Sequence, residues 1–245
     1  TVSVLYWRSS HRSAAMALQL NLYGYATPDN ARVTRILLAA EYAVVGIECH
    51  DVDALRAEDP ELFRLNCHPL VAAGGPVLET PQGFLFESNA IVRYLARLGL
   101  AAGIYGVSDF EATMIDAWLD YCLSEIDPHA FTVLKMVNGY CERDDAAVAD
   151  AHEAVMRGFD GLNGRLETLT FLVGERTTVA DLTVFASVDM YLRFCGAEHA
   201  APVYDRHPHV LRHYMTVLHL PTVQTVLRRI EGHGGLIPAR PATSE

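Results

Sequence analysis

The stretch Thr170-Phe-Leu-Val-Gly-Glu-Arg-Thr-Thr-Val-Ala-Asp-Leu-Thr-Val-Phe185 decides the fold, because it leads into a long buried helix. Thr178 and Asp181 form the Ser/Thr-x-x-acid pattern of a helix capping box, in which the two side chains take up free backbone N–H groups. Apolar residues then recur every three to four positions, at Val179, Leu182, Phe185, Val188 and Leu192. This spacing predicts a helix that is buried deeply in a core. Gly174 permits a tight turn before it.

The composition is that of a globular protein, with 245 residues of which 51% are hydrophobic and 20% are charged. This length allows one large core or two modest ones. The net charge of −11 argues against direct binding to nucleic acid or anionic lipid, because phosphate contacts need clustered cations. No apolar run approaches the roughly 18 residues of a membrane span. The five scattered cysteines favour free thiols in a reducing compartment, so we expect a cytoplasmic protein.

Residues 1–16 differ in composition from the rest of the chain. Arg8 and Arg12 lie among serines, and no acidic residue occurs before Asp29. Such a composition is similar to an organelle-targeting leader, which would direct the protein to the mitochondrion. The alternative is a simple extension, with Met16 as the natural start of the domain. At the other end, residues 233–245 hold glycines and prolines and predict a flexible tail.

Residues 17–99 predict an α/β domain. Leu18, Leu20 and Leu22 alternate with polar residues, which indicates a strand. We expect a helix that opens at Pro28, a second strand at 44–50, a short helix or irregular segment at 53–65, a hairpin of strands 76–79 and 84–86, and a helix from Ser88. The order β-α-β-α-β-β-α is that of a thioredoxin-like domain, whose parallel crossover requires the first helix.

Residues 108–232 predict an all-α domain that follows a glycine-bearing connector. Helices are expected at about 109–138, 144–168, 178–194, 208–219 and 221–231, from the 3.6-residue period of their apolar positions. The predicted fold class is therefore an α/β thioredoxin-like domain followed by an all-α helical domain.

The opening stretch resembles the capped core helix of the glutathione-transferase fold. Its first part, Thr170-Phe-Leu-Val-Gly-Glu-Arg176, is most similar to the N-terminal transferase-like domain of the gamma subunit of eukaryotic translation elongation factor 1. The resemblance covers residues 17–232 and implies the same two-domain fold. In that gamma subunit a linker and another folded domain normally follow. If this sequence is complete, we therefore expect it not to be a whole gamma subunit.

Phe86-Glu87-Ser88-Asn89-Ala90-Ile91 matches the Glu-Ser-x-Ala-Ile element of the transferases. Ser88 begins a predicted helix, where free N–H groups and the helix dipole favour an anion. The resemblance implies that Glu87 and Ser88 bind the γ-glutamyl end of glutathione, and we expect them to border the cleft between the domains. The alternative is that Ser88 only caps its helix.

Transferase chemistry requires a hydroxyl group that hydrogen-bonds the glutathione thiolate and lowers its pKa. The resemblance places Thr27 at the position of the serine in serine-type transferases, with Tyr25 and Tyr23 nearby as alternatives. Pro76 matches the family's cis proline, but Gly75 replaces the branched apolar residue that precedes it. A glycine removes a fixed side-chain wall and raises the entropy of the unbound loop. We therefore expect glutathione, the implied co-substrate, to be held weakly.

Metal-ligand residue types occur at Cys49-His50 and Cys67-His68, but the pairs lack the usual spacing of zinc ligands, so we expect no metal. Cys195 is interpreted as a small core residue.

Two groups of polar residues each allow a site interpretation and a surface interpretation. We expect a solvated helix start for the histidines near Pro208, which are His207, His209 and His213. The first long helix carries acids that either line the interdomain cleft or, as we expect, form ordinary surface charge: Asp116, Asp120, Glu125 and Asp127.

Three functions agree with these observations. The first is an interaction or scaffold module of the elongation-factor-gamma type, with weak or no transferase activity, in a multi-subunit assembly or a homodimer. The second is an active glutathione transferase that conjugates glutathione to electrophiles. The third is a transferase-fold accessory subunit of an organellar assembly. The Gly75 replacement favours the first.

Overall fold

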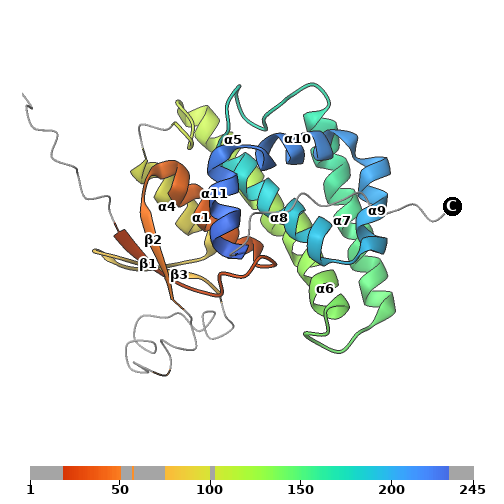
Figure 1. Cartoon of the computed structure of the whole chain (residues 1–245). Coiled ribbons are helices and arrows are strands. Elements are labelled where there is room, and N and C mark those ends of the chain that lie inside the picture. Colours follow the sequence, from red (N-terminus) through yellow and green to blue (C-terminus); the bar gives the residue numbers. More distant parts are fainter. Residues whose placement is uncertain (1–18, 51–56, 58–74, 100–102, 232–245) are drawn as a thin grey trace, which may run out of the picture.

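The computed structural model describes residues 19–50, 57, 75–99 and 103–231, and it places a small mixed sheet beside a bundle of helices (Figure 1). Strand β1 (Gln19–Tyr23) runs parallel to β2 (Gly46–His50) and antiparallel to β3 (Val77–Thr80). Strand β4 (Gly83–Phe86) completes the order β2-β1-β3-β4 as the antiparallel partner of β3. The expected leader 1–16, nearly all of 53–65, Cys67-His68 and the tail 233–245 lie outside the described residues.

Helix α1 (Ala31–Ala43) connects the two parallel strands, as their crossover requires. It begins three residues later than expected from Pro28, because the side chain of Asn30 accepts the Val33 N–H at 3.3 Å and caps the helix. Val44 ends the helix in the left-handed conformation, with φ 57°. The expected second strand therefore starts at Gly46 rather than at residue 44.

Helices α1 and α4 (Ser88–Leu98) pack on each other and lie between the sheet and the helical domain (Figure 1). The predicted hairpin and the predicted start of α4 at Ser88 are both confirmed. The buried face of α4 carries Ile91, Val92 and Leu95. Its burial beside α1 determines where the helix N-terminus lies relative to the sheet.

The second domain is helical throughout its described length. Its elements are α5 (Asp109–Tyr121), a π-helical turn η3 (Cys122–Ile126), α6 (Asp127–Val137), α7 (Asp145–Leu166), α8 (Val179–Phe194), α9 (Ala197–Arg206), α10 (Pro208–Leu218) and α11 (Pro221–Glu231). The single helix expected at 109–138 is thus interrupted by η3. Helix α9 was not expected, because Pro202 lies inside it and a proline ordinarily signals a helix end.

Helix α8 is the centre of the molecule. Every residue from Val179 to Leu192 is buried, and the helix contacts α1 and α4 of the first domain as well as its neighbours in the second. The C-terminal α11 packs back onto α1, where Arg229 lies 3.6 Å from Glu41. One continuous hydrophobic core consequently runs from Leu20 in β1 to Leu227 in α11.

The predicted capping box of α8 is present and forms part of a larger buried network. The Asp181 carboxylate accepts the Thr178 N–H at 2.8 Å and the Thr178 hydroxyl at 2.9 Å. It also accepts the Leu172 N–H at 2.9 Å, and lies 2.9 Å from His213 Nε2. Asp181 therefore joins the preceding loop, the start of α8 and helix α10.

The solvated surface expected for the histidines near Pro208 is wrong for two of them. His207 and His213 are buried, and each pairs through Nε2 with a carboxylate of another helix at 2.9 Å, Asp160 for the first and Asp181 for the second. The partners are distant in sequence, so the helical pattern around Pro208 does not reveal them.

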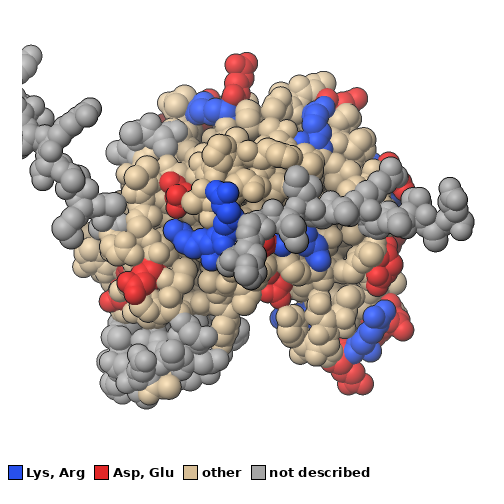
Figure 2. Space-filling model, viewed as in Figure 1, with Lys and Arg blue, Asp and Glu red and all other residues tan. Residues whose placement is uncertain are grey.

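Acidic and basic side chains are mixed on the face shown in Figure 2. The basic groups at the centre of this view lie over α11, whose last turn carries Arg228 and Arg229. None of the helices in the described parts of the chain is both long and apolar enough to cross a membrane.

We expect Thr178→Ala to lower the free energy of unfolding by about 1 kcal/mol, because it removes a buried hydroxyl from the capping box. Urea denaturation followed by circular dichroism measures this change. The matched control is Thr113→Ala, an exposed helical threonine whose loss should cost less than about 0.5 kcal/mol. Equal midpoints for Thr178→Ala and the parent would contradict the capping assignment.

Candidate functional site

The strand register brings the predicted site residues to one end of the sheet. Tyr23, the last residue of β1, pairs with Val77, the first of β3, and Val77 pairs with Phe86, the last of β4. The chain segments next to this row carry Tyr25, Thr27, Gly75, Pro76, Glu87 and Ser88. A Cβ placed on Gly24 would lie 3.5 Å from Pro76 Cα, so the loop after β1 contacts the segment before β3.

Ser88 and Glu87 lie at the N-terminus of α4, as predicted. Glu87 has φ 67° and ψ 116°, a conformation that non-glycine residues seldom adopt and that is often found at functional sites. Within the described residues, the first-turn N–H groups of α4 have no protein acceptor, which suits an anion. Ser88 itself is only 4% exposed, however, so its hydroxyl is not openly accessible.

The segment before β3 departs from the pattern that the resemblance implies. The Gly75–Pro76 bond is trans, like every other peptide bond in the described ranges. Gly75 is half-buried and Pro76 is buried.

A pocket of about 510 Å³ opens between the start of α1 and helix α6. The first domain contributes Tyr25, Thr27, Asp29, Asn30 and Arg32, and the helical domain contributes Phe131, Leu134, Lys135 and Tyr140. Of the predicted site residues, Thr27 and Tyr25 thus line this pocket, and the other four are not among its described lining. Asn30 orders its rim by donating to the Tyr25 carbonyl at 2.9 Å while it caps α1.

A buried ion pair joins α1 to α6 below this pocket. Arg35 Nη2 lies 2.8 Å from Asp127 Oδ2, and the side chains are 0% and 1% exposed. The Ser187 hydroxyl donates to Asp127 at 2.7 Å and accepts from Arg35 at 2.9 Å. Arg35 also donates to the Asn89 side-chain oxygen at 3.1 Å. Elements α1, α4, α6 and α8 therefore meet at one polar junction.

Two further contacts continue outward from this ion pair. One turn along each helix, the Arg32 guanidinium lies over the Phe131 ring, 4.7 Å from its centre, and forms a wall of the pocket. At the rim, the Tyr140 hydroxyl donates to the Asp29 carboxylate at 3.0 Å. The three interdomain contacts therefore range from the fully buried ion pair to the exposed hydrogen bond of Tyr140. The pocket is lined by the residues of the two outer contacts, Arg32 with Phe131 and Tyr140 with Asp29.

The π turn explains how Asp127 comes to face α1. The Asp127 N–H donates to the Cys122 carbonyl, five residues back, as in a π helix. The turn therefore holds one residue more than an α-helical turn, which changes the side chains that face inward. Asn89 donates to the nearby Leu119 carbonyl at 2.7 Å. The interpretation of Asp127 as surface charge is consequently wrong. Burial raises the pKa of the neighbouring Cys122 thiol to about 12, so this cysteine is protonated and unreactive.

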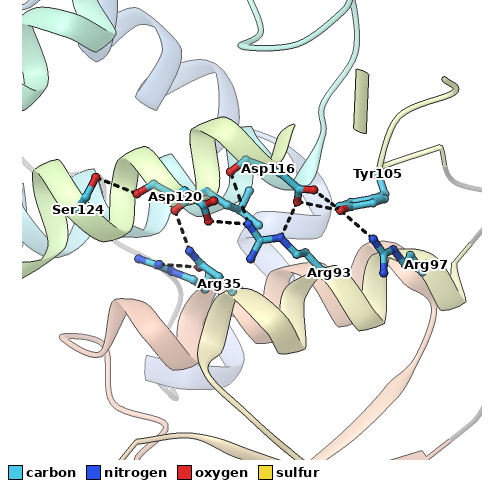
Figure 3. Close-up of polar contacts among 9 residues, drawn as sticks. Arg35, Arg93, Arg97, Tyr105, Asp116, Asp120 and Ser124 are labelled. Carbon is cyan, nitrogen blue, oxygen red and sulfur yellow. Dashed lines mark hydrogen bonds and ion pairs between the residues drawn. The ribbon is translucent and has the colours of Figure 1, made fainter. Parts of the chain in front are cut away.

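A second, more exposed polar contact joins the domains on another side (Figure 3). Arg93 of α4 forms ion pairs with Asp116 and Asp120 of α5. The Tyr105 hydroxyl donates to Asp116 at 2.8 Å, and Arg97 donates to that hydroxyl at 3.1 Å. Burial and the Asp116 carboxylate raise the pKa of Tyr105, which keeps its hydroxyl protonated. Asp116 and Asp120 therefore hold the domain interface rather than forming isolated surface charge.

Metal-ligating side chains do not gather anywhere in the described ranges in a group of three or more. Cys49 is exposed on β2, and Cys195 is buried with its thiol 3.6 Å from the Ala130 carbonyl, as expected of a core residue. Sequence reasoning missed Arg32, Phe131 and Lys135. A signal existed in the Arg32-x-x-Arg35 spacing, which places two cations on one side of a helix whose other residues are mostly apolar.

Comparison with known proteins identifies two family models in the chain. The glutathione S-transferase N-terminal domain matches residues 18–97, and the glutathione S-transferase C-terminal domain matches residues 111–221. Among curated proteins, an elongation factor 1-gamma of Trypanosoma cruzi is 35% identical over 219 residues, 86% of this chain and 50% of the relative. A probable elongation factor 1-gamma 2 of Arabidopsis thaliana is 33% identical over 215 residues, with 86% and 49% covered.

Solved structures share the fold at lower identity. A poplar glutathione transferase F1 superposes with a TM-score of 0.74 at 19% identity, covering 88% of this chain and all of the other. A glutathione transferase of Phanerochaete chrysosporium, solved with oxidized glutathione, gives a TM-score of 0.74 at 20% identity, with 89% and 97% covered.

We expect Asp127→Ala to lower the free energy of unfolding by roughly 3–5 kcal/mol, because it leaves the buried Arg35 without its counter-ion. The double variant Arg35→Met with Asp127→Leu should recover about half of that loss, since it removes both charges. Chemical denaturation of the parent and both variants measures the difference. A loss below about 1 kcal/mol for Asp127→Ala would place this ion pair among the weak surface pairs.

Proposed function

The chain belongs to the glutathione S-transferase family, and from this premise we propose that it is an interaction module of the elongation factor 1-gamma type with weak or no transferase activity. The module would position protein partners within a multi-subunit assembly, in the cytoplasm. The curated relatives support this proposal by their identity, although the chain spans about half of their length. The activity and the partners of those longer proteins apply to this chain only as part of the proposal.

One structural observation carries the low activity that we propose. A transferase needs the thiol-activating hydroxyl and the carboxylate-binding helix start to act on one glutathione molecule. Here Thr27 lines the open pocket, whereas Ser88 is buried and absent from its described lining. Glutathione bound at the start of α4 would then be poorly placed for Thr27, and correct placement is worth several kcal/mol in such reactions. The Gly75 replacement adds to this effect.

An active transferase is the second candidate, and one observation favours it. The Thr27 side chain is exposed in the pocket, within the same lining as the Arg32 cation. A hydroxyl donor together with a nearby positive charge is the environment that stabilises a thiolate. In that case Thr27 would activate glutathione toward an electrophile. The third candidate, an organellar accessory subunit, is based on the leader-like residues 1–16, which lie outside the described residues, and on the altered loop before Pro76.

We expect turnover of glutathione with 1-chloro-2,4-dinitrobenzene, an aryl halide, to be at least about a hundredfold below the typical enzyme value of about 10 per second. Thr27→Ala should leave this residual rate within about twofold, because a hydroxyl that is not aligned with the thiol contributes little to the barrier. Steady-state assays at saturating glutathione measure both rates. A rate near the typical value that Thr27→Ala abolishes would establish the active transferase instead.

The interaction role needs a separate measurement. Mixed with the other subunits of elongation factor 1, the chain should co-elute with them in size-exclusion chromatography. We expect Thr27→Ala to co-elute equally well, because the proposed module does not use the hydroxyl group in the pocket. Failure of both proteins to associate, at concentrations where each is folded, would contradict the module proposal.

A further inference from the structure

Helix α9 contacts α7 through a histidine at each of its ends. Near its start, the His199 ring meets the His152 ring of α7 edge to face, with the ring centres 5.2 Å apart. At its C-cap, His207 Nε2 lies 2.9 Å from the Asp160 carboxylate of α7. The two ends therefore differ in chemistry, because one imidazole faces another base and the other faces an acid.

Between these two contacts α9 is held weakly. It lies at the edge of the helical domain beside α7 (Figure 1), and its buried residues are Ala200 and Val203. Its N-cap is Gly196, which has φ 93° and supplies no side-chain cap. Pro202 lies inside the helix and removes one helical hydrogen bond. An element with so little burial opens at a low cost in free energy.

A proton is unfavourable at the start of α9, because His152 is partly buried and faces another base. Burial lowers the pKa of His152, and the nearby His199 lowers it further. Its Nδ1 also lies 2.6 Å from the Tyr191 hydroxyl of α8. Burial raises the pKa of Tyr191, so this hydroxyl stays protonated and can donate to a neutral His152. A protonated His152 no longer accepts that bond.

Charged and titratable groups from several parts of the chain surround this pair of histidines. They are Arg143 before α7, Glu153 on α7, Tyr191 on α8, Cys195 after α8, and Glu198 and Arg206 on α9.

These groups do not cancel the effect of burial on His152. Glu153 favours a protonated His152, whereas Arg206 disfavours it, and the pKa of His152 remains lowered. The Glu198 carboxylate lies 3.5 Å from His199 Nδ1, so it can pair with a charged His199. A charged His199 in turn repels a charge on His152.

The contact at the other end of α9 does not require a neutral imidazole. A neutral His207 donates from Nε2 to Asp160, and a charged His207 also attracts that carboxylate. Arg206 lies 3.8 Å from the same carboxylate and adds a permanent positive charge. Asp160 therefore holds the C-terminal end of α9 in either protonation state of the histidines.

We propose that α9 is a pH-sensitive element, whose N-terminal half loosens from α7 when His152 is protonated while Asp160 continues to hold its C-terminal end. The chain can move at Gly196, because a glycine adopts many backbone conformations. This inference goes beyond the proposed function, since it requires neither glutathione nor a protein partner.

The direction of the effect follows from the linkage between protonation and opening. A histidine released from α7 has a pKa of about 6.5, above the lowered pKa of His152 in the closed state, so the open state binds protons more readily. The closed state is therefore most favoured above about pH 6.5. It loses stability as the pH falls below that value and through the lower pKa of the closed state. At pH 5.5, one histidine can raise the open population by at most about tenfold.

Hydrogen–deuterium exchange at pH 7.5 and pH 5.5, corrected for the intrinsic exchange rate at each pH, tests the proposal. The probes are the amides of His199 and Ala200, which donate to the Gly196 carbonyl. We expect their protection to fall about three- to tenfold at pH 5.5. The amides of α8 and α10 should change by less than about twofold, because the loosening is confined to α9.

Variants assign the effect to the pair. His152→Gln should reduce the loss of protection to less than about twofold, because the amide can still bond to Tyr191 but takes up no proton. His199→Gln should give an intermediate loss, since the burial of His152 remains. The matched control is His219→Gln, which removes an exposed histidine at the C-cap of α10 and should keep the full loss.

Asp160→Asn tests the contact at the other end. It removes the carboxylate that His207 and Arg206 share, so the loss of protection at pH 5.5 should spread to the C-terminal half of α9. The ratio between the two pH values is taken within each variant, so a uniform change in stability cancels. Circular dichroism at pH 7.5 confirms that each variant is folded.

Equal protection of α9 at both pH values in the parent would overturn the proposal. A full loss in His152→Gln would overturn it too, because another group would then be responsible. A loss of the same size in α8, α9 and α10 would indicate general unfolding by acid and would also contradict a local response of α9.

Discussion

The buried contact between Arg35 and Asp127 determines how the two halves of this protein meet. Arg35 belongs to α1 of the sheet domain, Asp127 begins α6 of the helical domain, and both side chains are excluded from solvent. Removing two charges from water is costly, and the cost is offset only where geometry and additional hydrogen bonds are favourable. Ser187 and Asn89 supply those bonds. A small rotation between the domains would break several of them at once, so the junction specifies one relative orientation.

The pocket is a direct consequence of that orientation. The ion pair joins α1 to α6, and the pocket lies one turn along both helices from it, where Arg32 covers Phe131 and Tyr140 reaches Asp29. The start of α4 is tied to the same junction through Asn89, and its packing on α1 and the pairing of Val77 with Phe86 position it relative to the sheet. Thr27 lines the pocket, whereas Ser88 at the start of α4 is buried and is not part of the described lining. One family fold can host different functions, so the fold alone does not decide whether this site is catalytic.

Basic side chains also form contacts elsewhere within the protein. Most arginines of the described ranges serve internal contacts, as Arg93 does at the α4–α5 interface and Arg193 does beside Asp189 and Glu231. The chain has 30 acidic and 19 basic residues, so pairs of this kind reduce further the number of basic groups that have no acidic neighbour.

The sequence by itself determined the features that depend on neighbours along the chain. The capping box at Thr178, the buried period of α8, the hairpin and the helix start at Ser88 all follow from local spacing, and the structure confirms each of them. Only the tertiary structure decided which polar groups meet. Arg35 and Asp127 are 92 positions apart, and His213 and Asp181 are 32 apart, so no local pattern couples them. The π turn and helix α9 do not follow from the local pattern, and the pocket forms between helices that are distant in the sequence. The packing of those helices decides whether a buried charge meets a partner and whether a space between helices stays open.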